Sequence, residues 1–392
     1  MKIAVNLLYL EDNTKSGVGK HIEDILTGLE KLKALDEFYL IVQKKLYDNY
    51  FCPANAERPF KNVHIVICPE GRLFKSAING IKRVEYIARR LYLNRFVMPV
   101  LLKDIDPDLM FYPFNDSTNN TSIKYPFVSV IHDLFYKNFP NRKKTFLSKL
   151  YAVYVDFKHR RMLEKASKIV VLSEFVKSDI LKYFPGTNSD NIVVIPNAVV
   201  MSGNTTAHDG IKTPFLLCVS EHGIHKNHLT LLKAYNIIKN KMPHRLVLLG
   251  DKKEETTVIL KYIDENGLGN KVDLISNISD PERNWLYQNT DLFISPSLHE
   301  GFGRTPIEAA ILGAMVLTSR ETSLPESTCE ILDYYEPATD ENALADKISE
   351  LLAHPTPVER RGKIAKTFRE LYDPARIAGL YYDLFHIIIR DT

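Results

Sequence analysis

The chain has 392 residues, of which 45% are hydrophobic and 25% charged, an ordinary composition for a globular protein and a length that favours two domains. No apolar run reaches 18 residues, which excludes a membrane-spanning helix, and the N-terminus lacks a signal-peptide pattern. Four scattered cysteines without a CxxC pair argue against a disulfide framework or a zinc site, so we expect a cytoplasmic protein.

Positive charge is concentrated in the first half of the chain. Residues 1–200 contain 30 Lys and Arg against 21 Asp and Glu, whereas residues 201–392 contain 21 against 27. The net charges are therefore +9 and −6. This asymmetry predicts that the first half faces something anionic, for which nucleic acid, a phospholipid surface and a phosphorylated substrate are all candidates.

Short apolar runs alternate with longer amphipathic stretches along the whole chain. The runs are KIAVNLLYL (2–10), FYLIVQ (38–43), VHIVIC (63–68), DLMFYP (108–113), PFVSVIH (126–132), KIVVLS (168–173), IVVIP (192–196), FLLCVS (215–220), RLVLLG (245–250), VDLIS (272–276), DLFISP (291–296) and AMVLTS (314–319). Their richness in Val, Ile and Leu without strict alternation predicts parallel strands covered on both faces. Helical patterns lie between them, for example at 18–33, 173–183, 227–240 and 341–353. The sequence therefore predicts an α/β fold.

The segment 200–213 interrupts this alternation. It is rich in Gly, Ser, Thr and Asn, which is typical of a linker between domains. We therefore predict a first domain at 1–199 and a second, also doubly wound, at 214–373. Residues 374–392 begin with a proline and carry apolar residues at helical spacing, which predicts a C-terminal helix.

Two motifs follow strands in the first half. SGVGK (16–20) opens a helix, so Gly17 and Gly19 form either a partial glycine-rich loop or simply a flexible helix start. His132 and Asp133 end the run PFVSVIH and begin the next loop, where a side chain can meet a ligand in an interdomain cleft. The alternative for His132 is a core or capping histidine.

Two basic segments also lie in the first half. Residues 75–95 contain six Lys and Arg and one acid, and residues 136–168 contain ten and two, with aromatic residues between them. Such helices can lie on an anionic membrane surface, and a solvated helix face is the alternative.

The second half has a polar loop at a strand-to-helix junction, within LCVSEHGIHKNHL. Lys226 stands where it could pair with a diphosphate, and His225 beside it could donate a further hydrogen bond. The alternative is a solvated loop lysine.

A second junction, HEGFGRTPIEAA (299–310), places glycines between two carboxylates. Gly301 and Gly303 let the backbone approach a ligand, and the helix that opens near Pro306 favours a phosphate at its N-terminus. Glu308 could accept the hydroxyls of a ribose and Glu300 those of a second sugar. The alternative is a pair of surface acids.

Together these motifs resemble those of retaining glycosyltransferases of family 4, and in particular the bacterial O-polysaccharide mannosyltransferase branch. The resemblance is carried by SGVGK, IHDLFY, IVVLSEFVKSDI, VIPNAV, SEHGIHKN, SLPE and, most specifically, DLFISPSLHEGFGRTPIEAAILGAMVLTS, in which seven residues separate the two glutamates. It implies the GT-B fold. Two Rossmann-like domains with parallel sheets would face an interdomain cleft, the first would bind the acceptor, and the C-terminal helix would cross back to it.

The resemblance also implies roles for individual residues. Glu308 would bind the nucleotide ribose, Glu300 the donor sugar and Lys226 the diphosphate. His132 would lie near the donor sugar and the acceptor, and Asp133 beside it is a candidate for acceptor binding. The other donor-binding candidates are Gly17 and Gly19 in a loop that closes over the diphosphate, His225, the amides around Gly301, Phe302 and Gly303 for sugar hydroxyls, and the amides of Arg304 and Thr305 for the diphosphate.

One departure from the family pattern concerns the diphosphate. The family usually has an arginine just before its lysine, and this chain has His225 there. A protonated His225 or Arg304 would have to supply the missing charge.

The expected reaction needs no metal and no cofactor beyond the nucleotide-sugar substrate. The Asp104, Asp106 and Asp108 series lies in a loop before a strand, outside a plausible catalytic loop. Positive groups and helix N-termini would carry the charge of the leaving nucleoside diphosphate. Front-face attack, with the leaving phosphate accepting the acceptor's proton, would retain the sugar configuration.

GDP-mannose is the expected donor, and a glycan or lipid-linked glycan the expected acceptor, with UDP- and dTDP-linked sugars as alternatives. A nucleotide-sugar epimerase and a non-catalytic nucleotide-sugar-binding scaffold are the rival functions. The basic segments 75–95 and 136–168 predict peripheral contact with the anionic cytoplasmic membrane face. No nucleic-acid-binding motif is present in the sequence, so nucleic acid is not expected as a partner.

Overall fold

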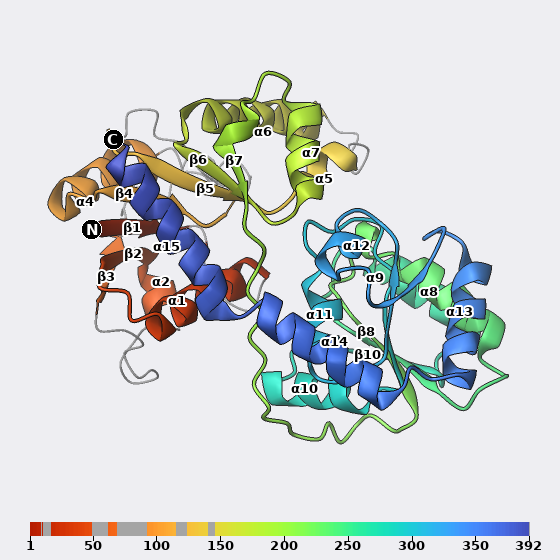
Figure 1. Cartoon of the computed structure of the whole chain (residues 1–392). Helices are drawn as coiled ribbons and strands as arrows, with labels where there is room; N and C mark the ends of the chain where they lie inside the picture. Colours follow the sequence, from red (N-terminus) through yellow and green to blue (C-terminus); the bar gives the residue numbers. More distant parts are fainter. Residues whose placement is uncertain are drawn as a thin grey trace. The chain divides into compact units, whose positions relative to one another are not determined.

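The structure is a computed structural model that describes residues 1–8, 10, 17–48, 62–68, 92–114, 124–139 and 146–391. The chain divides into two compact units (Figure 1). Residues 1–198 together with 374–392 form the first unit, and residues 199–373 form the second.

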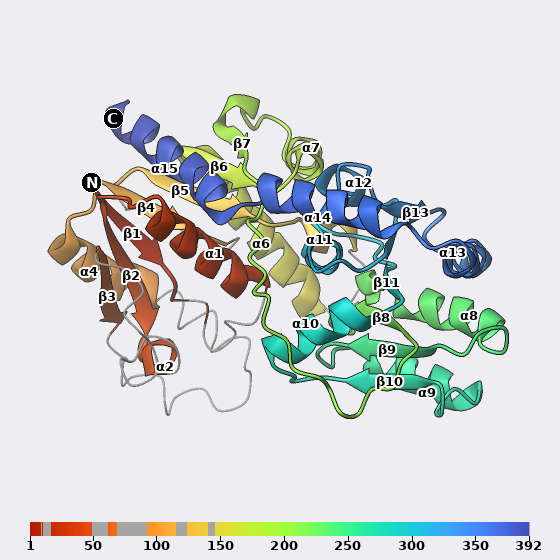
Figure 2. The ribbon, with the colours of Figure 1, turned by 60° about the horizontal axis from the view of Figure 1, so that its bottom comes forward.

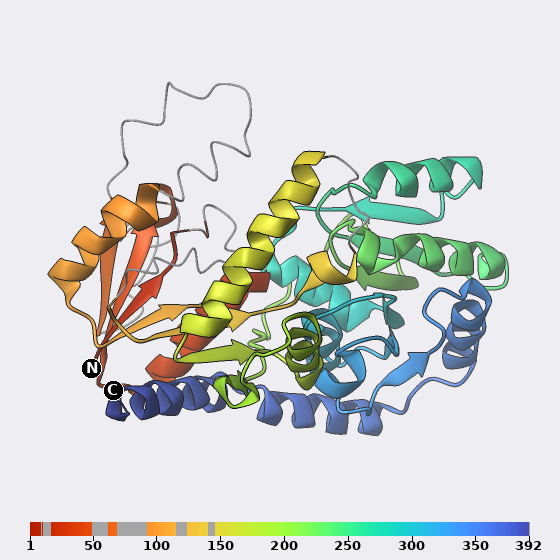
Figure 3. The ribbon, with the colours of Figure 1, turned by 90° about the horizontal axis from the view of Figure 1, so that it is seen from above.

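The first unit contains a seven-stranded sheet among its described residues, in the order β3-β2-β1-β4-β5-β6-β7, with every pairing parallel. Its strands are β1 (Lys2–Asn6), β2 (Glu37–Gln43), β3 (Val63–Cys68), β4 (Leu109–Tyr112), β5 (Phe127–Ile131), β6 (Lys168–Val171) and β7 (Ile192–Val194). Its helices are α1 (Gly17–Lys31), α2 (Lys44–Leu46), η3 (Leu93–Val97), α4 (Met98–Ile105), α5 (Phe135–Asn138), α6 (Phe146–Lys165), α7 (Glu174–Tyr183), η5 (Ser189–Asn191) and α15 (Pro374–Arg390). Figure 3 shows α6 as the long helix that lies across the strands of this sheet.

The C-terminal helix α15 packs lengthwise on α1 within the first unit (Figure 2). Gly28 permits this approach, because a Cβ there would lie 2.0 Å from the Pro374 carbonyl oxygen and 2.5 Å from Ala378 Cβ. Tyr381 is fully buried, and its ring centroid lies 5.5 Å from that of Phe111 in β4. The prediction that a C-terminal helix returns to the first domain is confirmed.

The second unit contains a six-stranded parallel sheet in the order β10-β9-β8-β11-β12-β13, within the part of the chain that the structure describes. Its strands are β8 (Phe215–Val219), β9 (Arg245–Leu249), β10 (Val272–Ile275), β11 (Leu292–Ser295), β12 (Val316–Ser319) and β13 (Asp333–Tyr335). Its helices are η6 (Ile224–Lys226), α8 (His228–Ile238), α9 (Thr256–Glu265), α10 (Asp280–Asn289), α11 (Arg304–Ile311), α12 (Leu324–Ser327), α13 (Glu341–Ala353) and α14 (Val358–Leu371). Branched side chains from the central strands are fully buried, as parallel strands covered on both faces require.

All twelve apolar runs interpreted as strands contain a strand of the structure, and the fold class is confirmed. The short edge strand β13 was not anticipated, because it has three residues and begins with a charged one. No helix among the described residues is long and apolar enough to cross a bilayer.

Residues 200–213 differ from their prediction as a linker, because they belong to the second unit. The buried side chain of Asn284 in α10 donates through Nδ2 to the carbonyl oxygens of Ser202 and Asn204, both at 3.0 Å. The polar composition that suggested a linker thus supplies acceptors for a buried amide, and the boundary between the units falls at 198/199.

Candidate functional site

The second unit carries candidate residues on both sides of the point where its strand order reverses. Strands β8 and β11 are neighbours there, with β9 beyond one and β12 beyond the other. The loop after β8 leads to Lys226, and the loop after β11 leads to Glu300. Crevices at such reversal points, outside the carboxyl ends of the strands, are where open α/β sheets bind ligands.

Lys226 and Glu300 form an ion pair at this point. Lys226 Nζ lies 2.7 Å from Glu300 Oε1, and both side chains are 16% exposed. Burial alone would raise the pKa of the Glu300 carboxyl. The Lys226 ammonium, aided by His225 and Ser297, outweighs burial and holds that pKa below its ordinary value. The Glu300 carboxyl is therefore ionised at neutral pH.

The backbone of Glu300 is fixed by the loop that follows β12. The Glu300 N–H donates to Thr322 Oγ1 at 3.0 Å, and the Glu300 carbonyl accepts from the hydroxyls of Thr322 and Ser323, at 3.2 and 2.8 Å. Ser323 opens the segment SLPE and is fully buried. The SLPE region thus anchors the loop that presents Glu300.

His225, the residue that replaces the family's usual arginine, lies against its own loop. A Cβ at Gly223 would come within 2.9 Å of His225 Cε1, so the glycine leaves room for this ring. The His225 carbonyl accepts a 2.7 Å hydrogen bond from the Leu298 N–H. The backbone of His225 therefore joins the two loops that carry Lys226 and Glu300.

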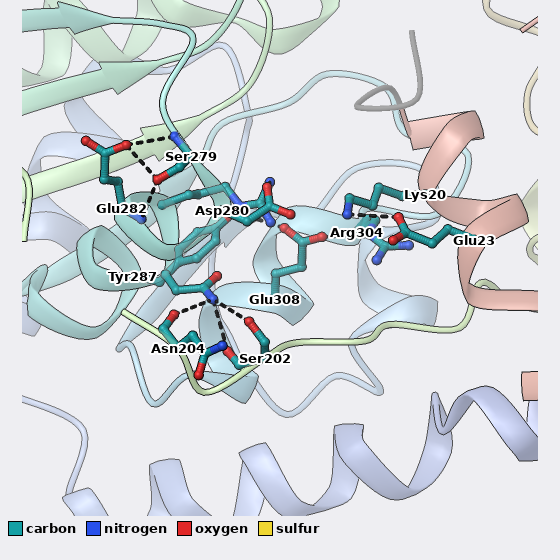
Figure 4. Close-up of polar contacts among 12 residues, drawn as sticks. Lys20, Glu23, Ser202, Asn204, Ser279, Asp280, Glu282, Tyr287, Arg304 and Glu308 are labelled. Atoms are coloured by element: carbon teal, nitrogen blue, oxygen red, sulfur yellow. Dashed lines mark hydrogen bonds and ion pairs between the residues drawn. The ribbon is translucent and has the colours of Figure 1, made fainter. Parts of the chain in front are cut away.

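Glu308 lies one turn inside α11, with both carboxylate oxygens engaged (Figure 4). Arg304 Nε lies 2.6 Å from Oε1, and the Tyr287 hydroxyl donates to Oε2 at 3.1 Å. Glu308 is 5% exposed and Tyr287 fully buried. Burial raises the pKa of Tyr287 well above its ordinary value, and the Glu308 carboxylate adds to this effect. The carboxylate is thus held rigidly, and the Arg304 side chain is engaged by it.

The glycine loop before α11 has a specific backbone requirement at Gly303. This residue has φ +83°, and a Cβ would lie 2.5 Å from Leu324 Cδ2. Phe302 is 4% exposed and its ring meets that of Tyr372 edge to face, with centroids 5.2 Å apart. Because the Phe302 side chain is buried, only the backbone N–H of this residue is suited to contact a ligand. Thr305 is the second residue of α11, at its N-terminal end.

Two positions of this site were missed by the sequence reasoning. Tyr287 lies in α10 at helical spacing with other buried residues and looked like core. Asn227 adopts a left-handed backbone at φ 57°, between η6 and α8. An Asn directly before a helical run is the signal that could have marked it.

Two buried histidines, His222 and His228, lie on either side of Lys226 in the sequence, in the loop after β8 and at the start of α8. His228 Nε2 lies 3.1 Å from Ser220 Oγ, and its ring meets that of His222 edge to face at 5.1 Å. Burial lowers the pKa of His228 to about 3, and the nearby charges of His222 and Lys226 contribute. His228 is therefore neutral at physiological pH.

In the first unit, His132 lies at the carboxyl end of β5, beside β4. Its Nε2 lies 2.8 Å from the Pro113 carbonyl oxygen, which can only accept, so Nε2 carries the proton. Its ring meets that of His21 at 5.0 Å, edge to face. Burial lowers the pKa of His132 and outweighs the opposing effects of Pro113 and Asp133. His132 is therefore neutral, with the lone pair on Nδ1.

The other first-unit candidates have local roles in the structure. Asp133 Oδ1 accepts from the Phe135 N–H at 3.0 Å, in the turn just before the short helix α5. Gly17 and Gly19 lie in the first turn of α1, so the structure places them in a helix start and not in a loop. Ser16, the first residue of SGVGK, is outside the described residues.

The described residues contain no cluster of three or more His, Cys, Asp or Glu side chains arranged to hold a metal ion.

Two family models match the chain. Residues 208–370 match glycosyl transferases group 1, and residues 16–202 match glycosyltransferase family 4. The chain carries a glycosyltransferase family 4 domain followed by a glycosyl transferases group 1 domain. The group 1 match contains both Lys226 and the glutamate pair, and the family 4 match contains His132.

Among known proteins, the serotype-specific mannosyltransferase WbdA of Escherichia coli is 26% identical over 258 residues, which cover 58% of this chain and 30% of WbdA. The chain thus matches less than a third of the length of that relative. The sucrose-phosphate synthase of Thermosynechococcus elongatus has a TM-score of 0.77 at 17% identity over the full length of both chains. Anabaena HepE, in complex with UDP and glucose, has a TM-score of 0.67 at 16% identity, covering 98% and 99% of the two chains. These structural likenesses establish the GT-B fold.

Proposed function

We propose that this glycosyltransferase moves mannose from GDP-mannose to a hydroxyl of a glycan or lipid-linked glycan acceptor in surface polysaccharide synthesis, with retention of configuration. The similarity to WbdA, a mannosyltransferase by its name, supports the sugar and the pathway. The observation that carries the transfer chemistry is the Lys226–Glu300 pair at the strand-order reversal, beside the N-terminus of α11.

Lys226 would stabilise the leaving nucleoside diphosphate. The bond between the anomeric carbon and the diphosphate oxygen breaks, the acceptor oxygen bonds to the same face of that carbon, and the acceptor proton passes to the departing phosphate. Negative charge grows on the diphosphate in this step, and a fixed ammonium with helix amides is the arrangement that stabilises it. No step requires a divalent cation or a cofactor.

Glu300 and Glu308 would bind the two other parts of the donor, the sugar and the ribose. Glu300, freed from part of its contact with Lys226 when the diphosphate arrives, would accept hydrogen bonds from sugar hydroxyls, and the N–H groups of Gly301 and Gly303 would donate to sugar oxygens. Glu308 would accept ribose hydroxyls, held in place by Tyr287 and Arg304. Arg304, held on Glu308 through Nε, would add positive charge near the diphosphate.

His132 would act on the acceptor side. It is a neutral imidazole at the carboxyl end of β5, with its Nε2 proton held by the Pro113 carbonyl. A neutral imidazole is better suited to orient a sugar hydroxyl than to stabilise negative charge on the leaving group. Asp133 would support acceptor binding beside it.

The surface of α6 supports peripheral contact with an anionic membrane. Val153 and Phe157, one turn apart, are 68% and 55% exposed. Arg161 lies 5.6 Å from the centre of the Phe157 ring. Apolar side chains flanked by cations match the chemistry of an anionic lipid interface. The other basic segment, 75–95, lies largely outside the described residues.

A panel of nucleotide sugars tests the function. GDP-mannose should raise the melting temperature more than UDP-glucose or a dTDP-linked hexose, and should be hydrolysed slowly without acceptor. EDTA should leave this hydrolysis unchanged. Stronger stabilisation by UDP-glucose would show that the donor is UDP-glucose and not GDP-mannose. Loss of hydrolysis in EDTA and its recovery with Mg²⁺ would refute the metal-free scheme. Failure of every nucleotide sugar to bind would refute the transferase function.

A further inference from the structure

Asn227 has a backbone conformation that few residues adopt. Its φ of 57° and ψ of 34° are left-handed, and it both ends η6 and precedes α8. Asn tolerates this region better than other residues with a Cβ, because its short polar side chain can bond locally. The chain can therefore turn sharply directly after Lys226.

The side chain of Asn227 is 8% exposed and bonds in three directions. Nδ2 donates to the carbonyl oxygens of Pro296, at 3.1 Å, and Ala338, at 2.8 Å. Oδ1 accepts from the Thr230 hydroxyl at 2.7 Å. Both amide protons are thus used on carbonyl oxygens beyond β11 and β13, which lie in other segments of the second unit.

Residues 225–227 and 296–300 are joined by three contacts in succession. The Leu298 N–H donates to the His225 carbonyl, Lys226 Nζ lies on Glu300, and the Asn227 amide bonds Pro296. Lys226 therefore stands between two contacts that hold its own backbone to the loop of Glu300. One of these two contacts depends on a side chain, and that side chain is Asn227.

We propose that Asn227 is a positioning residue that fixes the Lys226 ammonium for the leaving diphosphate, without touching the donor itself. This inference rests on the proposed transfer function. The amide does two things that no other side chain combines here: it tolerates the left-handed backbone and offers two donors to two buried carbonyls. Losing either function lets Lys226 shift relative to Glu300.

Two substitutions keep the left-handed backbone and remove the two donated hydrogen bonds. Asn227→Gly removes the side chain, whereas Asn227→Asp keeps its shape but places a carboxylate against two carbonyl oxygens. Each should lower kcat for transfer about 100-fold, the cost of a displacement on the order of 1 Å, with a smaller change in donor KM. Thr230→Val, which removes only the hydroxyl on Oδ1, should have a smaller effect. Lys33→Gly, at an exposed position with φ 52° in the first unit, is the matched control.

A double-mutant cycle tests whether Asn227 acts through Lys226. In a Lys226→Ala background, Asn227→Gly should change kcat/KM by less than about 3-fold, because the group it positions is gone. An equal loss in both backgrounds would show an independent structural effect and overturn the proposal.

A second readout does not depend on activity. An amine-reactive acylating reagent, followed by peptide mass spectrometry, measures the accessibility of Lys226 relative to Lys233 on α8. In Asn227→Gly the ratio of the two rates should rise several-fold, since opening of the loop exposes the paired ammonium. An unchanged ratio overturns the positioning role, even if no donor in the panel binds and the proposed function itself fails.

Discussion

Lys226 and Glu300 are joined by a 2.7 Å ion pair between the loops that follow two adjacent strands, β8 and β11. The pair brings a cation and an anion to the one place in the second sheet where neighbouring loops diverge. An anionic ligand that binds Lys226 exchanges one negative partner for another, so Lys226 does not become an unpaired buried charge. The carboxylate that it displaces is then available for hydroxyl groups on the same ligand.

The first prediction concerns the charge of this pair. Lys226→Ala should lower kcat by several hundred-fold, which is the typical cost of losing one contact that stabilises transition-state charge. The measurement is initial-rate release of nucleoside diphosphate at saturating donor. Lys233→Ala, which removes a half-exposed lysine 3.8 Å from Glu341 on the same unit, should retain wild-type kcat. Near-normal turnover of the Lys226 variant would refute its assignment.

The second prediction concerns the Tyr287 hydroxyl that donates to Glu308, the glutamate proposed to bind the ribose. Tyr287→Phe removes the donor to Glu308 Oε2 from a fully buried site, and this should weaken donor binding by about 5–20-fold, or roughly 1–2 kcal/mol. Because the ribose does not react, KM should rise with little change in kcat. Calorimetric titration with GDP and 2′-deoxy-GDP checks the cause: the variant should lose most of the discrimination between them. If the variant still distinguished GDP from 2′-deoxy-GDP as the wild type does, the ribose would not bind at Glu308.

The sequence predicted the strands well because each is a run of Val, Ile and Leu bounded by polar loops, and such runs bury themselves in any parallel sheet. It predicted Lys226 and Glu300 because both stand at strand-to-helix junctions. It could not predict that Asn227 bonds Ala338, since a contact across 111 residues leaves no periodic signal in one sequence. Tyr287 was hidden for the same reason, because its ring packs as core while only its hydroxyl serves the site. The segment 200–213 was misinterpreted, because a polar stretch bonded to Asn284 has the same composition as a free linker.

The third prediction separates backbone strain from steric overlap at the glycine loop. Gly303 and Gly313 both have positive φ, +83° and +91°, but only a Cβ at Gly303 meets another atom, Leu324 Cδ2 at 2.5 Å. Gly313→Ala should cost about 1 kcal/mol of unfolding free energy through strain, and should keep its activity. Gly303→Ala should cost about 2–4 kcal/mol and reduce turnover at least 10-fold, because the loop before α11 has to move. Urea denaturation and initial rates measure the two effects. Equal losses of unfolding free energy in the two variants would show that the Leu324 side chain moves aside without a free-energy cost.

The fourth prediction concerns the exposed face of α6. Phe157→Ser removes an apolar side chain that is 55% exposed and contributes little to the core, so thermal stability should remain unchanged. Co-sedimentation with vesicles containing phosphatidylglycerol should fall several-fold, since the apolar anchor is lost while the cations remain. Neutral phosphatidylcholine vesicles should bind neither protein. If the Phe157→Ser variant still bound the anionic vesicles, the membrane contact would not be made by this face of α6.

The fifth prediction is a pH dependence that follows from His228. Its pKa in the folded protein is lowered to about 3, against an ordinary value of 6.5, so between these values the unfolded chain binds a proton that the folded chain excludes. Stability should therefore fall as the pH decreases from 6.5 towards 3, with His228 contributing up to about 1.4 kcal/mol per pH unit. His228→Gln cannot bind that proton, and its unfolding free energy, measured by urea denaturation between pH 4 and 6, should depend less steeply on pH by about this amount. His354→Gln, at an exposed position, should leave the slope of the wild type intact. Identical slopes for wild type and His228→Gln would mean that the loop that carries Lys226 opens and lets His228 take up a proton before the protein unfolds.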